Sequence, residues 1–574
     1  MIPSPKLGLA LSGGGFRASL FHIGVLAHLA EMNLLRSVQV LSTVSGGSII
    51  GAYYYLHLKR LLESKPDRLL EPQEYVDLVK RMEQGFVAGI QKNLRTRAYA
   101  DFGRNLRMIR DRSFTRSDRM AELYDEAFYD SVAPHPRVCL SELKIQPPKA
   151  PRHFYPRKHN AGRINKVPVL ILNSTTLNSG RNWQFSAVDA GEHPPLEGEN
   201  EYNKNMLLKA FRYDQRDLPD KYRKVPLSVA VASSAAVPGI FPPLPLTGLY
   251  EDVTPKLVDG GVFDNQGISA LLFERCSHIL VSDASGQMDN DAKPASGLIG
   301  VLARTNSVLM DRVRDEGFEL LETSRKSGLI RNYVMMHMRE GFPIEELNPL
   351  PKPEDQTKES VDYGINPNVQ LRLSNMRTDL DSFTDVEAYS VMYSGYRIAE
   401  KMVPEKWKRE FRGGKSEGRG RKSEAGGTPW EFEAIQKDAS SDRPSERYMK
   451  QLAVSSETLF KAYRLMPSLR ILGILILIIA LAVGGGVLYG AGWLISEFGL
   501  APAFVTLLVI FAGALILGLI FRKSWLKRLW EGFVVQYVFT IAIALIGTIL
   551  AKLHLIWIDP RFLRYGSLRG QPKR

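Results

Sequence analysis

The sequence of 574 residues contains only two cysteines, Cys139 and Cys276, and their separation matches no metal-binding spacing. No metal site is therefore expected from them, and their scarcity is typical of a reducing compartment. A phosphate-binding loop of the G-x-x-x-x-G-K-[ST] type is also missing, because Arg409 stands where the run 414–416 would need its first glycine. Nucleotide hydrolysis is thus not expected.

The sequence also lacks nucleic-acid motifs, although 75 Lys and Arg against 61 Asp and Glu give a net charge of +14. Neither a zinc-finger spacing nor an aromatic-basic RNA motif occurs. The basic residues instead cluster beside apolar segments, which favours an anionic membrane surface as partner and no nucleic acid. Internal repeats are absent, and residues 1–5 lead straight into an expected strand at Lys6, so no signal peptide is expected.

A glycine-rich turn follows that first strand. Residues 6–11 form a short apolar run that predicts a buried strand, and residues 18–32 carry apolar side chains at helical spacing. Three consecutive glycines, Gly13 to Gly15, separate the two. Such a turn can present backbone N–H groups to an anion.

The same glycines satisfy a loose dinucleotide fingerprint through Gly13, Gly15 and Ala18. That interpretation needs an acidic residue at the end of the second strand, where this chain has Thr43, Val44 and Ser45. Dinucleotide binding is therefore disfavoured, and no cofactor is expected.

A second strand, turn and helix unit follows at once over residues 38–44, 45–47 and 49–62. Ser45 stands at the turn, at the carboxyl end of the strand and beside a helix N-terminus whose dipole favours negative charge. A serine at such an elbow, close to a turn that offers N–H donors, predicts a serine hydrolase.

Three residues are candidates for the base. His278 lies in an apolar run and His337 lies among methionines, settings in which a packed histidine is the commoner outcome. Asp259 ends a short apolar run before Gly260 and Gly261, which allow a sharp turn and a close approach. Asp259 is the preferred base, although Asp-Gly-Gly is also an ordinary turn signal.

Together these motifs resemble the four ordered signatures of the patatin-like phospholipases. The resemblance covers residues 6–267, with weaker continuation towards Ile398. Its motifs are Gly13-Gly14-Gly15-Phe16-Arg17, the Ser45 elbow, the segment 232–243 and Asp259-Gly260-Gly261, with 173–181 as the strand-end motif between elbow and base. The resemblance implies an α/β fold, a central sheet flanked by helices with a Ser-Asp dyad, that cleaves acyl esters of lipids.

The resemblance also implies a role for each residue. Asp259 would accept the proton of Ser45, which attacks the ester carbonyl, and water would release the acyl enzyme. Backbone N–H groups of Gly13, Gly14, Gly15 and Phe16 would form the oxyanion hole. Arg17 would orient the glycine loop or attract a phosphate head group. The alternative interpretation is that Arg17 is an ordinary surface charge at the start of the helix. No metal or cofactor is implied.

One position departs from the family pattern. The usual elbow is G-x-S-x-G, whereas this chain has Thr43 in the first position. That glycine relieves crowding beneath the strained nucleophile. Thr43 therefore predicts a slightly different elbow or lower activity.

The C-terminal region is strongly apolar. Residues 471–494, 503–521 and 533–550 are each near the length that spans a bilayer, and tryptophans lie near their ends. They predict two to three transmembrane helices. Basic residues flank the first and follow the second, whereas the loop between these two has none, which places the large N-terminal domain on the cytoplasmic side. If the third segment crossed the membrane fully, the basic C-terminal tail would lie outside the cytoplasm, against the positive-inside rule. The third segment is therefore either re-entrant, or it spans and the exception to the rule is tolerated.

These boundaries predict a catalytic domain over 1–405, with an insertion at about 61–163, a flexible linker over 406–450 and a membrane region over 451–574. Within the insertion, residues 102–112 place apolar side chains on one side of a helix and arginines near the other. That helix would rest on anionic lipid or form a solvated cap.

The expected function is that of an integral-membrane lipid acyl hydrolase of the phospholipase or lysophospholipase type, acting on membrane phospholipid or another lipid ester. The alternatives are a lipid transacylase and a catalytically weak membrane scaffold that keeps the fold.

Overall fold

The structure is a computed structural model of the chain. It describes residues 5–111, 113–192, 204–285, 291, 293–342, 363–411, 428–458, 461–466, 468–479, 482 and 540–568.

One ten-stranded sheet forms the centre of the described molecule, in the order β10-β9-β1-β2-β3-β4-β5-β6, with β8 pairing with β3 and β7 with β8. Strands β10, β9, β1, β2 and β3 run parallel, and the later pairings are antiparallel. The strands are β1 (Leu7–Leu11), β2 (Val38–Val44), β3 (Val169–Thr176), β4 (Asn182–Phe185), β5 (Asp189–Glu192), β6 (Phe211–Arg212), β7 (Leu244–Pro245), β8 (Lys256–Asp259), β9 (His278–Asp283) and β10 (Asn332–His337). The sheet confirms the expected α/β class.

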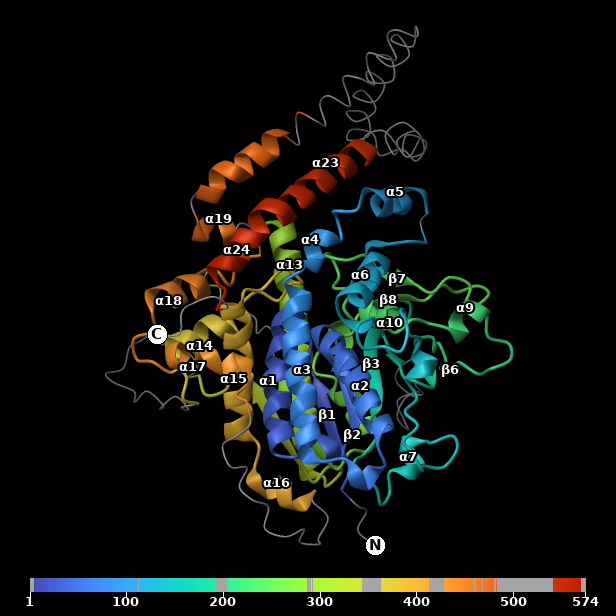
Figure 1. The fold of residues 1–574 in the computed structure, drawn as a ribbon. Coiled ribbons are helices and arrows are strands. Elements are labelled where there is room, and N and C mark those ends of the chain that lie inside the picture. Colours follow the sequence, from blue (N-terminus) through green and yellow to red (C-terminus); the bar gives the residue numbers. More distant parts are fainter. Residues whose placement is uncertain are drawn as a thin grey trace.

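Helices cover the sheet and extend past its carboxyl edge (Figure 1). They are α1 (Gly15–Glu31), α2 (Gly46–Ser64), α3 (Pro72–Ile90), α4 (Leu94–Arg97), α5 (Phe102–Arg110), α6 (Arg116–Tyr124), α7 (Pro156–His159), α9 (Asp220–Arg223), α10 (Leu227–Ser234), α11 (Gly261–Asp264), α12 (Ile268–Phe273), α13 (Leu298–Lys326), α14 (Pro367–Ser374), α15 (Asp385–Met402), α16 (Glu405–Glu410), α17 (Gln436–Ala439), α18 (Glu446–Ala453), α19 (Lys461–Leu465), α23 (Thr540–Leu553) and α24 (Asp559–Tyr565).

The two faces of the sheet bury alternate residues of each strand, as the strand period requires. On β1, Leu7, Leu9 and Leu11 belong to the larger apolar cluster, whereas Ala10 belongs to the smaller one. Helices α1, α2 and α3 supply the larger cluster, and α12 and α13 supply the smaller one. Because β1 and β2 are covered on both faces, their ends are held rigidly where the two predicted turns lie.

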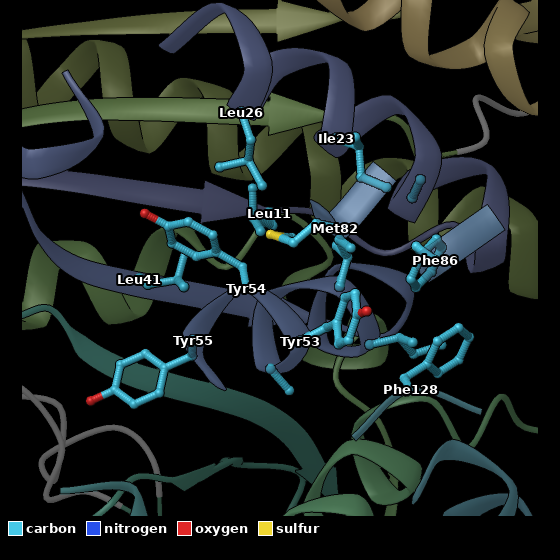
Figure 2. Packing of buried hydrophobic residues seen from close by; sticks show 14 of the residues in the cluster. Leu11, Ile23, Leu26, Leu41, Tyr53, Tyr54, Tyr55, Met82, Phe86 and Phe128 are labelled. Carbon is cyan, nitrogen blue, oxygen red and sulfur yellow. The ribbon is translucent and has the colours of Figure 1, made fainter. Parts of the chain in front are cut away.

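Aromatic side chains fill the core beneath the glycine turn. Phe86 of α3 stacks on Phe128 with ring centroids 4.7 Å apart, and both meet Phe16 edge-on at about 6 Å. Figure 2 shows Phe86 and Phe128 beside Met82, which is also on α3, and Tyr53 of α2. The glycine turn is therefore anchored at its helical end by a fully buried phenylalanine. Helix α3 is part of the main core, although it lies within the expected insertion.

The amphipathic segment in that insertion forms α5. Its Asn105 Nδ2 donates a hydrogen bond to Thr548 Oγ1 of α23 over 2.9 Å. Helix α5 therefore packs against the C-terminal part of the chain.

The structure differs from the expected flexible linker over 406–450. Trp407 of α16 is fully buried, as are Trp430 and Phe432, whose rings stack 5.6 Å apart. The buried carboxylate of Glu83 on α3 accepts the Phe432 N–H over 2.7 Å. Composition suggested a tether because charged and small residues dominate, but a few large aromatics attach this stretch to the core. Residues 412–427 lie outside the described part.

Among the described residues, no helix combines the length and the apolar character needed to cross a membrane. The expected span 503–521 lies wholly outside the described residues, and 471–494 and 533–550 lie partly outside them.

The described C-terminal residues contact the main body. Lys461 Nζ lies 2.6 Å from Asp381 Oδ2, and Asp559 Oδ1 accepts hydrogen bonds from Asn93 and Ser382. The carbonyl of Gly566 accepts the N–H of Val386 over 3.1 Å. Segments on both sides of 483–539 therefore dock on the same domain.

Candidate active site

Two strands meet head-on along β3, and this brings Ser45 and Asp259 together. Val44, the last residue of β2, pairs with Asn173 of β3. Asp259, the last residue of the oppositely directed β8, pairs with the next residue, Ser174. Residues more than 200 positions apart thus end at adjacent points of one strand. The convergence arises because β2 pairs in parallel with residues 169–173 and β8 pairs antiparallel with residues 174–176 along the same edge of β3, while β4 occupies the other edge.

Ser45 has a strained backbone, with φ 50° and ψ −117°. A non-glycine residue in this region is costly and persists only where its surroundings hold it. Its N–H donates to Ser234 Oγ over 3.0 Å, and Ser234 Oγ donates to the carbonyl of Asn173 over 2.6 Å. The N-terminus of α2 begins directly after Ser45. The predicted elbow is therefore present, and α10 braces it through Ser234.

Asp259 is buried, and burial raises the pKa of its carboxyl from 3.8 to about 6. The neighbouring Ser45 hydroxyl and the Gly261 N–H, which donates to Oδ1 over 2.7 Å, lower this pKa but do not outweigh burial. The other carboxyl oxygen of Asp259, Oδ2, is buried, and among the described residues no group forms a hydrogen bond of ordinary geometry with it. This oxygen is available to receive a proton, and its carboxyl is more basic than an exposed aspartate.

The glycine turn lies beside this pair and offers two N–H groups. Gly14 and Gly15 both have positive φ, at 129° and 57°, and backbone carbonyls of Ala284 and Thr378 would lie 2.7 Å and 2.1 Å from added β-carbons. Only glycine fits this turn. Neither N–H has an acceptor among the described residues, so both are available to an incoming anion.

The other two residues of the expected oxyanion hole are already engaged. The N–H of Gly13 donates to the Asn265 carbonyl over 2.9 Å, and that of Phe16 donates to the Asp379 carbonyl over 3.2 Å. Their role is to hold the turn. Of the four predicted oxyanion donors, only the N–H groups of Gly14 and Gly15 have no acceptor among the described residues.

Comparison with known proteins agrees with this geometry. Residues 9–272 match the family model of the patatin-like phospholipases. A comparison of the chain with curated proteins finds no match. The family match spans the glycine turn, the Ser45 elbow and Asp259, and it supports lipid acyl hydrolase activity in general.

Arg17 is buried, so its interpretation as a surface charge is wrong. Its Nη1 donates to the carbonyls of Ser374 and Met376, and its Nη2 donates to that of Ala284 over 2.9 Å. Ala284 is the residue that closes against Gly14. Arg17 therefore supports the glycine loop, and its burial does not suit a head-group site.

Neither histidine candidate lies beside Ser45. His278 starts β9 opposite Leu7, at the amino edge of the sheet, about 13 Å along the strands from the turn. Its Nε2 lies 3.0 Å from Glu410 Oε1. His337 ends β10 at the carboxyl edge, but β9 and β1 separate it from β2, a distance of about 14 Å. Its nearest acid is Asp283, 4.0 Å away.

Thr43 lies beneath the elbow, and its hydroxyl takes part in the hydrogen bonds around Ser45. Its Oγ1 forms a hydrogen bond with Ser48 Oγ over 2.9 Å, and Ser48 Oγ bonds Ser234 Oγ over 2.8 Å. The chain of hydroxyls therefore ends on the same Ser234 that holds the Ser45 N–H. The methyl group of Thr43 lies over Gly51 of α2, which leaves room for it.

Sequence reasoning missed Ser234, His22 and Asn265. His22 is buried, which lowers its pKa to about 4, and its neutral ring bridges Ser282 Oγ and the Ser12 carbonyl. Asn265 lies against Gly13 with its side-chain oxygen. Asn265 could have been found from the sequence, because it stands six positions after Asp259, next to the recognised motif. His22 could not, because nothing distinguishes it from the other residues of an apolar helix.

Proposed function

We propose that this chain is a lipid acyl hydrolase that works through an acyl-serine intermediate, with Ser45 as nucleophile and Asp259 as base. The observation that carries the proposal is the head-on approach of β2 and β8. The last residues of these strands pair with neighbouring residues of β3, and this brings the strained Ser45, directly after β2, close to the buried Asp259 at the end of β8. The family match over residues 9–272 supports the same chemistry.

In the proposed reaction, Asp259 takes the proton of the Ser45 hydroxyl while the serine oxygen attacks the ester carbonyl. The carbonyl oxygen becomes an anion that the N–H groups of Gly14 and Gly15 stabilise. Collapse of this intermediate breaks the bond to the alcohol oxygen, which takes the proton from Asp259 and leaves as the alcohol, and the acyl group stays on Ser45. Asp259 then takes a proton from water, which attacks the acyl enzyme; when the bond to Ser45 breaks, Asp259 returns the proton to the serine oxygen and the fatty acid is released.

A cavity of about 460 Å³, within the range of small-molecule sites, lies between the segment before β7, which contributes Ile240 and Phe241, and the C-terminal part of the chain. Neither Ser45 nor Asp259 is among its lining residues. Arg95, Asp381 and Lys461 bring charged groups to the same cavity. Its other apolar lining comes from Tyr99, Ala462, Ala551 and Phe562.

We further propose that apolar residues between 471 and 550 anchor the chain in a membrane with the catalytic domain on the cytoplasmic side. The docking of Lys461 and of Asp559 on the same domain supports an even number of crossings between them. Two spans satisfy this condition and keep Arg561 and Arg564 on the side of the catalytic domain. The conflict between the basic tail and the positive-inside rule then disappears.

Labelling with a fluorophosphonate probe, followed by mass spectrometry, tests the chemistry in membranes that contain the full chain. We expect the probe on Ser45 of the wild type and none on the Ser45→Ala variant. Asp259→Asn should lose ester hydrolysis to a similar extent as Ser45→Ala, by about 10⁴-fold, because residues that act as one unit are not additive. His337→Ala is the matched control and should keep most activity.

Two results would contradict the proposal. Absence of labelling and of hydrolysis in a folded wild type would favour a membrane scaffold. Loss of all activity in a folded His337→Ala variant would replace the dyad with another arrangement. Acyl transfer from labelled lipid to an added lipid alcohol, measured against fatty acid release, separates a transacylase from a hydrolase.

A further inference from the structure

Helix α13 is much longer than the strands that it connects. Its 29 residues span about 43 Å at 1.5 Å per residue, whereas β9 and β10 have six residues each. Its C-terminal half packs on the sheet, where Leu321 is fully buried. Between 298 and 313, none of the described side chains is buried. The N-terminal half therefore extends beyond the sheet.

This half carries an apolar stripe at helical spacing. Leu298, Leu302 and Leu309 are 77%, 61% and 60% exposed, and Val301 and Val308 are also exposed on the same face. From 293 to 310 the only charged residues are Lys293 and Arg304, and both are basic. An exposed leucine stripe is the feature by which interfacial helices enter lipid, and no acidic residue lies between Asp291 and Asp311 to oppose an anionic surface.

The stripe is connected to the catalytic site through α11. Helix α11 begins two residues after Asp259 and packs against α13. Its Val262 and Phe263 are partly exposed, as is Ile240 in the segment before β8. Exposed apolar side chains therefore lie on the helix that directly follows Asp259 and on α13, which packs against that helix. We call Ile240, Val262, Phe263, Leu298, Leu302 and Leu309 the apolar rim.

The position of the rim identifies its occupant. Helix α13 starts after the carboxyl end of β9 and extends toward the end of the molecule where α4, α5 and α23 lie (Figure 1). The chain leaves the described residues at 479 and 482 and returns at 540 near that same end, and the intervening sequence is strongly apolar. A bilayer that receives the intervening residues would face the rim.

We propose that the apolar rim docks on the anionic surface of a lipid bilayer, with the N-terminal half of α13 lying in the interface. This inference rests on the proposed lipid hydrolase function, because docking would bring the end of the sheet that carries Ser45 close to the lipid. A substrate molecule would then reach the site without crossing water. The membrane segments would hold the chain at the membrane, and the rim would set its orientation there.

A pair of matched labels tests the docking directly. Leu302 and Leu329 are 61% and 64% exposed and lie on opposite sides of the buried part of α13, with Leu329 next to the amino end of β10. Each is replaced by cysteine in a full-length Cys139→Ser chain, labelled with an environment-sensitive fluorophore and reconstituted in vesicles of phosphatidylcholine and phosphatidylglycerol. We expect blue-shifted emission and quenching by nitroxide-labelled lipid at position 302, and neither at 329.

Equal quenching at both positions, or none at 302, would overturn the proposal. A blue shift at 302 without lipid quenching would place a protein surface over α13, either a second copy or another segment of this chain, and would also overturn it. These readouts need no catalysis, so they remain decisive even if the chain hydrolyses no ester.

A second measurement joins docking to turnover. The double variant Leu302→Gln/Leu309→Gln should lower hydrolysis of bilayer phospholipid by about tenfold or more, since it removes apolar contact with the interface. Hydrolysis of a soluble short-chain ester should stay unchanged, and Leu329→Gln should affect neither. An equal loss on both substrates would show that α13 supports the fold of the site and not its docking.

Discussion

Thr43 packs its methyl group over Gly51, where an added β-carbon would lie only 2.5 Å from Thr43 Cγ2. The position that usually carries glycine at such an elbow is larger here, and the facing residue on α2 is the smallest one. Space beneath Ser45 is therefore supplied by Gly51. The hydroxyl of Thr43 meanwhile joins Ser48 and Ser234, which holds the Ser45 N–H.

This pairing predicts how substitutions at Thr43 act. Thr43→Val keeps the shape but removes the hydroxyl, so we expect kcat to fall by about tenfold, the equivalent of one hydrogen bond, with KM nearly unchanged. Thr43→Ser keeps the hydroxyl and should retain most turnover. Gly51→Ala should destabilise the wild type more than the Thr43→Ser background, because serine lacks Cγ2. Additive effects of Thr43→Ser and Gly51→Ala on the free energy of unfolding would refute the contact.

The oxyanion turn should tolerate no side chain at Gly14. Gly14→Ala would place a β-carbon 2.7 Å from the Ala284 carbonyl in a backbone conformation with φ 129°. We expect kcat to drop by about a hundredfold or more as the donor moves. Gly162→Ala is the control, since Gly162 also has positive φ but has no atom within 4 Å of an added β-carbon. Similar losses of activity in both variants would mean that general strain explains the effect.

The raised pKa of Asp259 predicts the pH dependence of the reaction. The carboxyl must be ionised to accept the Ser45 proton, so kcat/KM should fall about tenfold per pH unit below the pKa of about 6. The folded chain binds the proton of the Asp259 carboxyl more tightly than the unfolded chain does. The contribution of Asp259 to stability is therefore full below 3.8 and declines as pH rises to about 6.

Two measurements check this assignment. The pH profile with a soluble short-chain ester should show its acid limb near pH 6 and not near 4. Asp259→Asn should abolish the corresponding decline in the free energy of unfolding measured with denaturant. An acid limb close to the ordinary aspartate value would show that the carboxyl is hydrated in the working enzyme.

Residues 428–458 should be required for a stable catalytic domain. Phe432 is fully buried and stacks with Trp430, so Phe432→Ala should cost about 3–5 kcal/mol of unfolding free energy. Leu69→Ala, at a side chain that is 63% exposed, should change it by less than about 0.5 kcal/mol. Chemical denaturation of a chain that ends at 458 measures both. Equal stability of chains ending at 411 and 458 would contradict the packing.

Much of the local structure could be predicted from the sequence. The strands before the glycine turn and before Ser45, and the helices after each, have the expected types and nearly the expected bounds. These elements have strong periodicity, and glycine or serine at their ends has a specific conformational reason. Ser45, Asp259 and the glycine turn could be nominated for the same reason, since short motifs carry their own geometry.

The sequence could not show how segments far apart pack. From the sequence, Arg17 suited equally a surface position, a head-group site and a role in supporting the glycine loop. The structure decides for loop support, because the Arg17 guanidinium donates to the carbonyls of Ser374, Met376 and Ala284. Residues 428–450 looked like a linker because average composition hides two or three buried aromatics. Burial depends on which neighbours the folded chain provides, and composition does not specify them.

The sequence by itself determined the α/β class and was enough to nominate Ser45, Asp259 and the glycine turn as a site, because each of these motifs depends on a few neighbouring residues. Only the tertiary structure decided which N–H groups remain open, which hydroxyls hold Ser45, and that Asp259 rather than His278 or His337 approaches it. The physical reason is that hydrogen-bond partners and burial arise from the meeting of β2, β3, β8 and α10. The pKa of Asp259 likewise depends on burial that no local pattern encodes.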